Sequence, residues 1–106
     1  MTGATPSLRR AINATLVLHG VSSASVSVVL VTDEIMADLN QKHLNHLGPT
    51  DVLTFDYTEP NGSRSAFDGE IVICGEVATR EAARRGHSVT AELCLYAVHG
   101  VLHLLG

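Results

Sequence analysis

Apolar residues recur at helical spacing in four stretches of the chain. The first stretch, Pro6 to His19, carries Leu8, Ile12 and Leu16 four residues apart and is followed by Gly20. This spacing gathers side chains on one face of a helix, and a following glycine is a frequent helix stop. The same criteria predict three more helices, over Asp33 to His43, Glu76 to Arg85 and Thr90 to Leu105.

The ends of two of these helices carry their own signals. Asp33 is expected to cap the second helix, because aspartate at this position accepts hydrogen bonds from the first free backbone N–H groups. Ile35, Met36 and Leu39 would form the apolar stripe of that helix. The third helix ends in two arginines followed by Gly86, which is a favourable arrangement at a C-terminus.

Three shorter stretches have the period of strands. In Ser25 to Thr32, valine and leucine occupy both alternating sets of positions, so we expect this strand to be buried on both sides at its end. Val52 to Phe55 and Glu70 to Cys74 are β-branched runs, joined by a polar stretch containing Pro60-Asn61-Gly62. They predict a hairpin-like pair with a long loop. The expected fold is therefore α+β: one domain over residues 1–106, with three to four strands and four helices.

Composition narrows the class of protein. A chain of 106 residues is long enough for one small core. Its two cysteines, Cys74 and Cys94, are too few for a disulfide scaffold and lie in apolar runs, so we expect buried, reduced thiols. No apolar run reaches membrane length and no leader pattern opens the chain, which predicts a soluble, cytoplasmic protein without a membrane partner. The net charge of −4 argues against a general nucleic-acid binder.

The last eight residues, HGVLHLLG, place His99 and His103 one helical turn apart. Imidazoles four residues apart on a helix can bind one metal ion, as in the HExxH helix of zinc peptidases. Gly100 stands where that motif has its glutamate, so the general base of a peptidase is missing. From spacing alone, two core histidines bonded to backbone or water are an equally good interpretation.

Two features of the same helix favour the metal site. Glu92, Tyr96, His99 and His103 fall on one side, which makes a polar stripe, while Leu93, Ala97, Val101 and Leu104 would be buried on another. Glycine within a helix costs about 1 kcal/mol relative to alanine, so Gly100 indicates that something approaches the backbone closely there.

Four blocks of the chain resemble the signature blocks of the YbeY family in order and spacing. They are Leu39-Asn40, Pro49 to Phe55, Gly69 to Ile73, and HGVLHLLG. The resemblance implies a small α+β domain built around a mixed sheet. It also implies a metal-dependent endoribonuclease that cuts single-stranded RNA, acts in 16S rRNA maturation and ribosome quality control, and has ribosomal RNA and the ribosome or its proteins as partners. The family's terminal block reads HGxLHLxGxDH and binds one Zn²⁺ through three histidines. His99 and His103 match the first two, and the third would lie just past Gly106.

The chain departs from the family pattern beside the metal. An arginine that the family usually carries a few residues after the Leu-Asn pair aligns with Leu44. Lys42, His43 or His46 would replace it as the substrate-binding group, unless that role is lost. The strand that usually precedes the first helix is not evident, and Glu70 replaces an aspartate. No catalytic residue can be assigned, because the pattern does not identify a general base.

The remaining polar and aromatic residues have competing interpretations. We expect Phe55 and Phe67 in the core and Tyr57 and Tyr96 at the surface. Thr50 and Asp51 would cap a strand or line the cleft. Glu92 would be a solvated helix residue or, less simply, a partner that fixes the tautomer of His99.

Three functions stay open on the sequence. The first is the endoribonuclease. The second is a non-catalytic, ribosome-associated binding module with a structural metal, which the missing arginine favours. The third is a zincin-like hydrolase of another substrate, which Gly100 disfavours.

Overall fold

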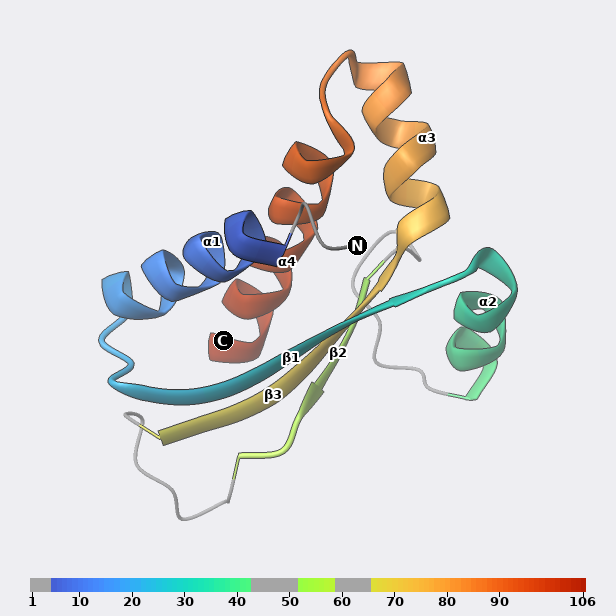
Figure 1. Cartoon of the computed structure of the whole chain (residues 1–106). Helices are drawn as coiled ribbons and strands as arrows, with labels where there is room; N and C mark the ends of the chain where they lie inside the picture. The colour runs from blue at the N-terminus through green and yellow to red at the C-terminus, as the bar shows by residue number, and fades with distance from the viewer. Residues whose placement is uncertain (1–4, 43–51, 59–65) are drawn as a thin grey trace.

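A computed structural model of the chain describes residues 5–42, 52–58 and 66–106. Four helices and a three-stranded sheet follow one another along these residues (Figure 1). The helices are α1 (Thr5–Leu18), α2 (Asp33–Lys42), α3 (Gly75–Arg85) and α4 (Val89–Leu105). The strands are β1 (Ser23–Val31), β2 (Val52–Asp56) and β3 (Ala66–Cys74). Each element predicted from the pattern is present, with ends shifted by a few residues at most.

The sheet is mixed, with β3 in the centre and the order β1-β3-β2. β1 runs parallel to β3, with Val28 beside Ile71, and β2 runs antiparallel to β3, with Val52 beside Ile73. The expected pairing of Val52 to Phe55 with Glu70 to Cys74 is thus confirmed. The turn predicted at Pro60-Asn61-Gly62 lies outside the described residues.

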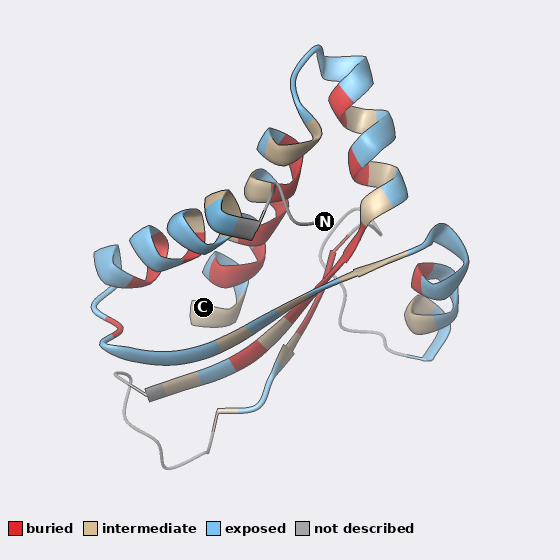
Figure 2. Cartoon of the chain, in the orientation of Figure 1, coloured by how far each residue is buried: buried red, intermediate tan, exposed pale blue. Residues whose placement is uncertain are grey.

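Helices cover the two faces of the sheet unequally. On one face α1, α3 and α4 enclose the main core, in which Ile71, Ile73, Leu93, Ala97 and Val101 are fully buried. On the other face α2 covers only one end of the sheet, where Met36 packs with Leu53, Val72 and Cys74. Among the described residues, no helix covers the rest of that face (Figure 1), and Ser23 to Ser25 at the start of β1 are exposed (pale blue in Figure 2).

Three expectations about α2 and β1 were wrong. They are that Asp33 caps α2, that Ile35 belongs to its buried stripe, and that β1 is buried on both sides at its end. Thr32 caps α2 in place of Asp33, because its hydroxyl accepts a hydrogen bond from the N–H of Ile35 (3.3 Å). The carboxylate of Asp33 instead binds Arg80 of α3, at 2.8 and 3.1 Å. Ile35 is 49% exposed, because α2 packs on the sheet through Met36 and Leu39. Val29 is 39% exposed, because β1 is an edge strand.

The two cysteines are free, as expected. Cys74 is fully buried and its thiol donates to Oδ1 of Asp33 (3.0 Å), whereas Cys94 is half-buried. Among the described residues, no single helix is long and apolar enough to cross a membrane, and α3 with α4 meets that test only as a pair bent by 117°.

Candidate functional site

The histidines predicted to bind metal lie on one unbroken helix. The side chain of Ser88 caps α4 by accepting from the N–H of Ala91 (3.1 Å), and the helix ends where the N–H of Gly106 donates to the carbonyl of His103 (3.1 Å). Gly100 does not interrupt α4. His99 and His103 therefore have the i, i+4 relation that brings two imidazoles to one side.

Gly100 is a point of close contact between α4 and the sheet. A Cβ placed on it would lie 2.9 Å from Cγ2 of Ile71 on β3, with two further Ile71 atoms at 3.1 and 3.2 Å. The close approach that Gly100 predicted is confirmed. Because Ile71 is fully buried, the contact fixes the turn of α4 that carries both histidines at a set distance from the sheet.

Both imidazoles are exposed and border a shallow hollow on the outer side of α4. Its lining combines them with three apolar side chains, Leu95, Val98 and Leu102. Leu95 is 48% and Leu102 is 42% exposed. Neither imidazole forms a hydrogen bond or an ion pair with another described residue. The interpretation as two core histidines is therefore wrong, because the ring positions are open to solvent.

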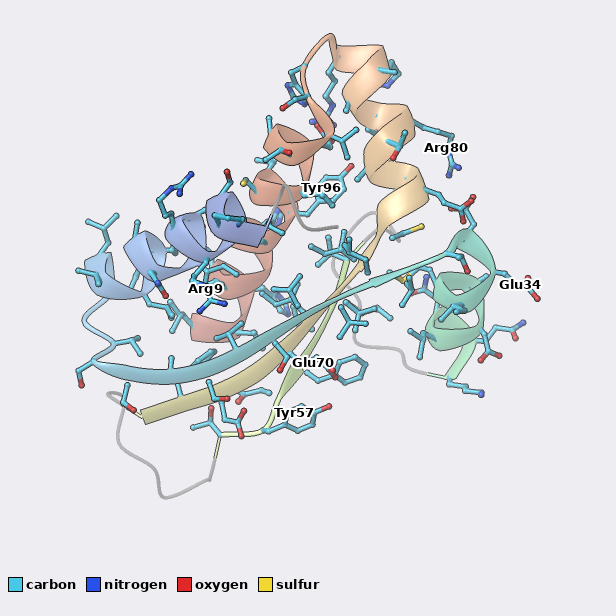
Figure 3. The ribbon with its side chains drawn as sticks, in the orientation of Figure 1. Arg9, Glu34, Tyr57, Glu70, Arg80 and Tyr96 are labelled. Carbon is cyan, nitrogen blue, oxygen red and sulfur yellow. The ribbon has the colours of Figure 1, made fainter. Side chains whose placement is uncertain are left out.

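The polar stripe continues along the helix, but its first half is buried. Tyr96 is 6% exposed and Glu92 is fully buried, because α3 packs against this part of α4 (Figure 3). The expectation of a surface Tyr96 was wrong. Both interpretations of Glu92 were wrong as well, because it is neither solvated nor bonded to His99.

Glu92 instead contacts residues at the junction between α3 and α4. Its Oε1 is hydrogen-bonded to Nε2 of His87, and its Oε2 lies 3.6 Å from a guanidinium nitrogen of Arg85. The bond to His87, with a smaller contribution from Tyr96 and the charge of Arg85, holds the pKa of Glu92 below the usual glutamate range despite burial. These contacts of Glu92 with His87 and Arg85 position the N-terminal half of α4, whereas His99 and His103 lie in its C-terminal half.

The donor set around the histidines fits part of a metal site. Catalytic zinc usually has three protein ligands and an open fourth position. Within residues 5–42, 52–58 and 66–106, no group of three histidine, cysteine or carboxylate side chains is arranged to hold a metal ion. His99 and His103 thus match two of three ligands in type, spacing and exposure.

The structure does not bring Lys42, the one expected substrate-binding residue that it describes, to the histidines. Lys42, the last residue of α2, is exposed and pairs with Asp38 one turn earlier (3.1 Å). α2 and α4 pack against opposite faces of the sheet. His43 and His46 lie outside the described residues, as do Leu44, Thr50 and Asp51.

One polar contact at the surface was not anticipated. The Tyr57 hydroxyl, exposed as expected, donates to Oε1 of Glu70 (3.1 Å), and the Tyr57 ring stacks on Phe55. Phe55 and Phe67 are only partly buried against the cores, so their expected core positions hold in part. The alternation of aromatic residues at positions 55 and 57 was the signal for the stack, because such positions share one face of a strand.

Comparison with known proteins agrees with the pattern of residues on α4. A family model described as Endoribonuclease YbeY matches residues 4–106. A curated relative with that name from Thermobifida fusca is 47% identical over 89 residues, covering 78% of this chain and 57% of the relative. The relative from Mycolicibacterium smegmatis is 46% identical over 92 residues, covering 79% of this chain and 52% of the relative.

A third relative of the same name, from Salinispora tropica, is 45% identical over 94 residues, covering 78% of this chain and 60% of the relative. The chain therefore spans somewhat more than half the length of the curated relatives it matches.

Proposed function

Because this chain belongs to the YbeY endoribonuclease family, we propose that it is a zinc-dependent enzyme that cuts single-stranded RNA, with His99 and His103 as two metal ligands. The observation that carries the proposal is the pair of exposed imidazoles one turn apart on α4, held over the sheet at Gly100. A bound zinc ion would supply Lewis acidity and an activated water for attack on a phosphodiester.

The residues around the pair have defined parts in this proposal. His99 and His103 bind and orient the metal through their exposed ring nitrogens. Leu95, Val98 and Leu102 give the site an apolar border. The third ligand would be a histidine at the position that the family motif gives it, or His43 or His46.

Lys42, His43 and His46 are proposed as the groups that hold the RNA phosphates. They would replace the family arginine that aligns with Leu44. Lys42 supports this role only through its exposure and its charge, since its pairing with Asp38 is a surface contact that a phosphate can displace. We place the activity in the cytoplasm, in 16S rRNA maturation and ribosome quality control, with ribosomal RNA and the ribosome as partners.

RNA cleavage tests the proposal. The chain is extended by three residues that end in histidine, to supply the family's third ligand, and incubated with zinc and a single-stranded or duplex RNA. The extended chain should cut the single strand, and a chelator should stop it. His103→Ala should lower the rate by about a hundredfold or more, because metal activation contributes several kcal/mol.

His19→Ala is the matched control, since His19 is an exposed histidine that does not line the hollow bordered by His99 and His103. It should leave cleavage unchanged. Undiminished cleavage by a folded, metal-free His99→Ala, His103→Ala double variant would contradict the proposal. RNA binding without cleavage in the extended, zinc-loaded chain would favour the non-catalytic binding module.

A further inference from the structure

The last turn of α4 ends over the sheet (Figure 1), where the side chain of Leu104 fits into a recess on β3. The recess exists because position 69 is a glycine, and a Cβ there would lie 2.9 Å from Cδ1 of Leu104. The same Cβ would lie 3.4 Å from the carbonyl oxygen of Phe55 and 3.5 Å from Cε1 of Phe67. Gly69 is buried, and Leu104 is half-buried against the main core. The end of the Leu104 side chain thus occupies the space of a missing side chain, which we call the Gly69 recess.

A second contact between α4 and β3 lies one turn earlier, with the large and small residues exchanged. There Gly100 of α4 lies against Ile71 of β3, and a Cβ on Gly100 would be 2.9 Å from Cγ2 of Ile71. Residues two apart on a strand are separated by about 6.8 Å on one face, and residues four apart on a helix by about 6 Å along its axis. Because the two spacings match, both contacts form at once. Together they fix the position of α4 along β3 and its rotation about its own axis.

The last turn of α4 depends on packing to stay helical. The final four carbonyl groups of a helix have no partner in the next turn, and helix ends fray. His103 and Leu102 are exposed. After Val101, the side chains that pack against the main core are those of Leu104 and Leu105. Of these two, Leu104 is the one that the Gly69 recess joins to the sheet.

His103 can act with His99 only while this turn is formed, because the i, i+4 relation is a property of the helix. From the two contacts we propose that Gly69 and Leu104 are positioning residues of the proposed metal site. Leu104, held in the Gly69 recess, keeps the last turn of α4 formed and directs His103 to the same ion as His99. Both residues act through His103. The inference rests on the proposed function, since it concerns how a proposed ligand is presented.

The position of Leu104 separates this role from a contribution to general stability. The rest of α4 is held by other residues, since Leu93, Ala97 and Val101 are fully buried. Removing a half-buried side chain at the end of the helix should free the last turn while the earlier turns stay packed. The loss should therefore appear at His103 and not along the whole helix.

Zinc titration of the 106-residue chain, combined with amide hydrogen exchange, tests the proposal. Histidine ring NMR follows the binding of zinc. Leu104→Ala should weaken zinc binding by about tenfold or more, the loss typical of a residue that orients a metal ligand. In the metal-free chain the amide of His103 should exchange about threefold or more faster, while the amides of Leu93 and Ala97 keep their rates.

Gly69→Ala tests the other partner of the contact. The added methyl group should expel the end of Leu104 and weaken zinc binding by about threefold or more. In a Leu104→Ala background the same change should cost nothing further, because the methyl group then enters empty space. A non-additive effect on zinc affinity would show that the two residues act on His103 through one contact.

Leu18→Ala and Gly75→Ala are the matched controls. Leu18 is an exposed leucine at the end of α1, and a Cβ at Gly75 would have no atom within 4 Å. Both variants should keep the zinc affinity and the exchange rate of His103 within about twofold of the parent values.

The outcomes separate this inference from the proposed function. If zinc shifts neither His99 nor His103 in the parent chain, the proposed function fails, and the exchange rates of the metal-free variants decide the inference. Zinc binding by the parent with unchanged affinity and unchanged His103 exchange in Leu104→Ala would overturn the inference and leave the proposed function standing. Faster exchange along all of α4 in Leu104→Ala would overturn it too, because it would mean a loss of general stability.

Discussion

Gly100 of α4 lies directly against Ile71 of β3, at a distance that leaves no room for a side chain. A Cβ at Gly100 would come within 2.9 Å of Cγ2 of Ile71, and Ile71 is fully buried. The contact lies in the same helical turn as His99, so the fit between helix and sheet decides where the exposed imidazoles stand.

Gly100→Ala tests this fit. Alanine favours the helix by about 1 kcal/mol, but overpacking a buried contact costs about 1–3 kcal/mol. Since Ile71 is enclosed on all sides, we expect the cost to prevail and the free energy of unfolding to fall by about 1 kcal/mol. Denaturant titration measures the change.

Gly75→Ala is the matched control, because a Cβ at Gly75, the first residue of α3, would have no atom within 4 Å. It should be neutral or stabilising. The cost of Gly100→Ala should shrink in an Ile71→Ala background, which removes the crowded atoms. A Gly100→Ala chain as stable as the parent would show that helix and sheet are not in tight contact.

Glu92 should make stability depend on pH. The pKa of Glu92 is lowered in the folded chain, chiefly by the hydrogen bond to His87. Its contribution is therefore fully present above the unperturbed glutamate pKa of about 4.3 and is lost as the pH falls through the lowered pKa of the folded state. Glu92→Gln should reduce stability near pH 7 by about 1–3 kcal/mol, because Arg85 and His87 lose the charge that they face.

The stability difference between the parent and Glu92→Gln should then shrink as the pH falls below about 4.3. Thermal unfolding across the acidic range measures it. Asp33 and Glu81 also have lowered pKa values, but they act equally in both chains and cancel in the difference. A difference that is constant or grows on acidification would contradict the assigned role of Glu92.

The two thiols should react at very different rates. Burial raises the pKa of Cys74, and its hydrogen bond to Asp33 raises it further. Because the thiolate is the reactive form, a thiol reagent should modify Cys94 first and Cys74 only when the chain unfolds. Mass spectrometry of the native chain over time checks this. Early labelling of Cys74 would mean that the α2–α3 corner opens readily.

Local patterns predicted most of the fold, because the elements carry their own signals. The helix of His99 and His103 follows from apolar spacing between Leu93 and Val101, and the end of α3 follows from Gly86, whose φ is +74°. The pairing of β2 with β3 follows from two β-branched runs separated by a polar loop.

The errors concern contacts between residues far apart in the chain. Aspartate is a favourable residue type at a helix cap, but the carboxylate of Asp33 binds Arg80, 47 positions later in the chain. Tyr96 and His103 lie on the same side of α4. Tyr96 is buried because α3 packs against it, whereas His103 is exposed. Periodicity reports which residues share a side of a helix. It does not report what covers that side.

Zinc titration followed by histidine ring NMR tests most directly whether His99 and His103 bind one metal ion together. Both rings should shift in parallel, while those of His19 and His87 stay unchanged. Binding to the 106-residue chain should be weak, because two imidazoles from one helix hold zinc less firmly than three ligands. His99→Ala should also abolish the shift of His103. Unchanged His99 and His103 signals in excess zinc, or zinc bound at other histidines alone, would contradict the account.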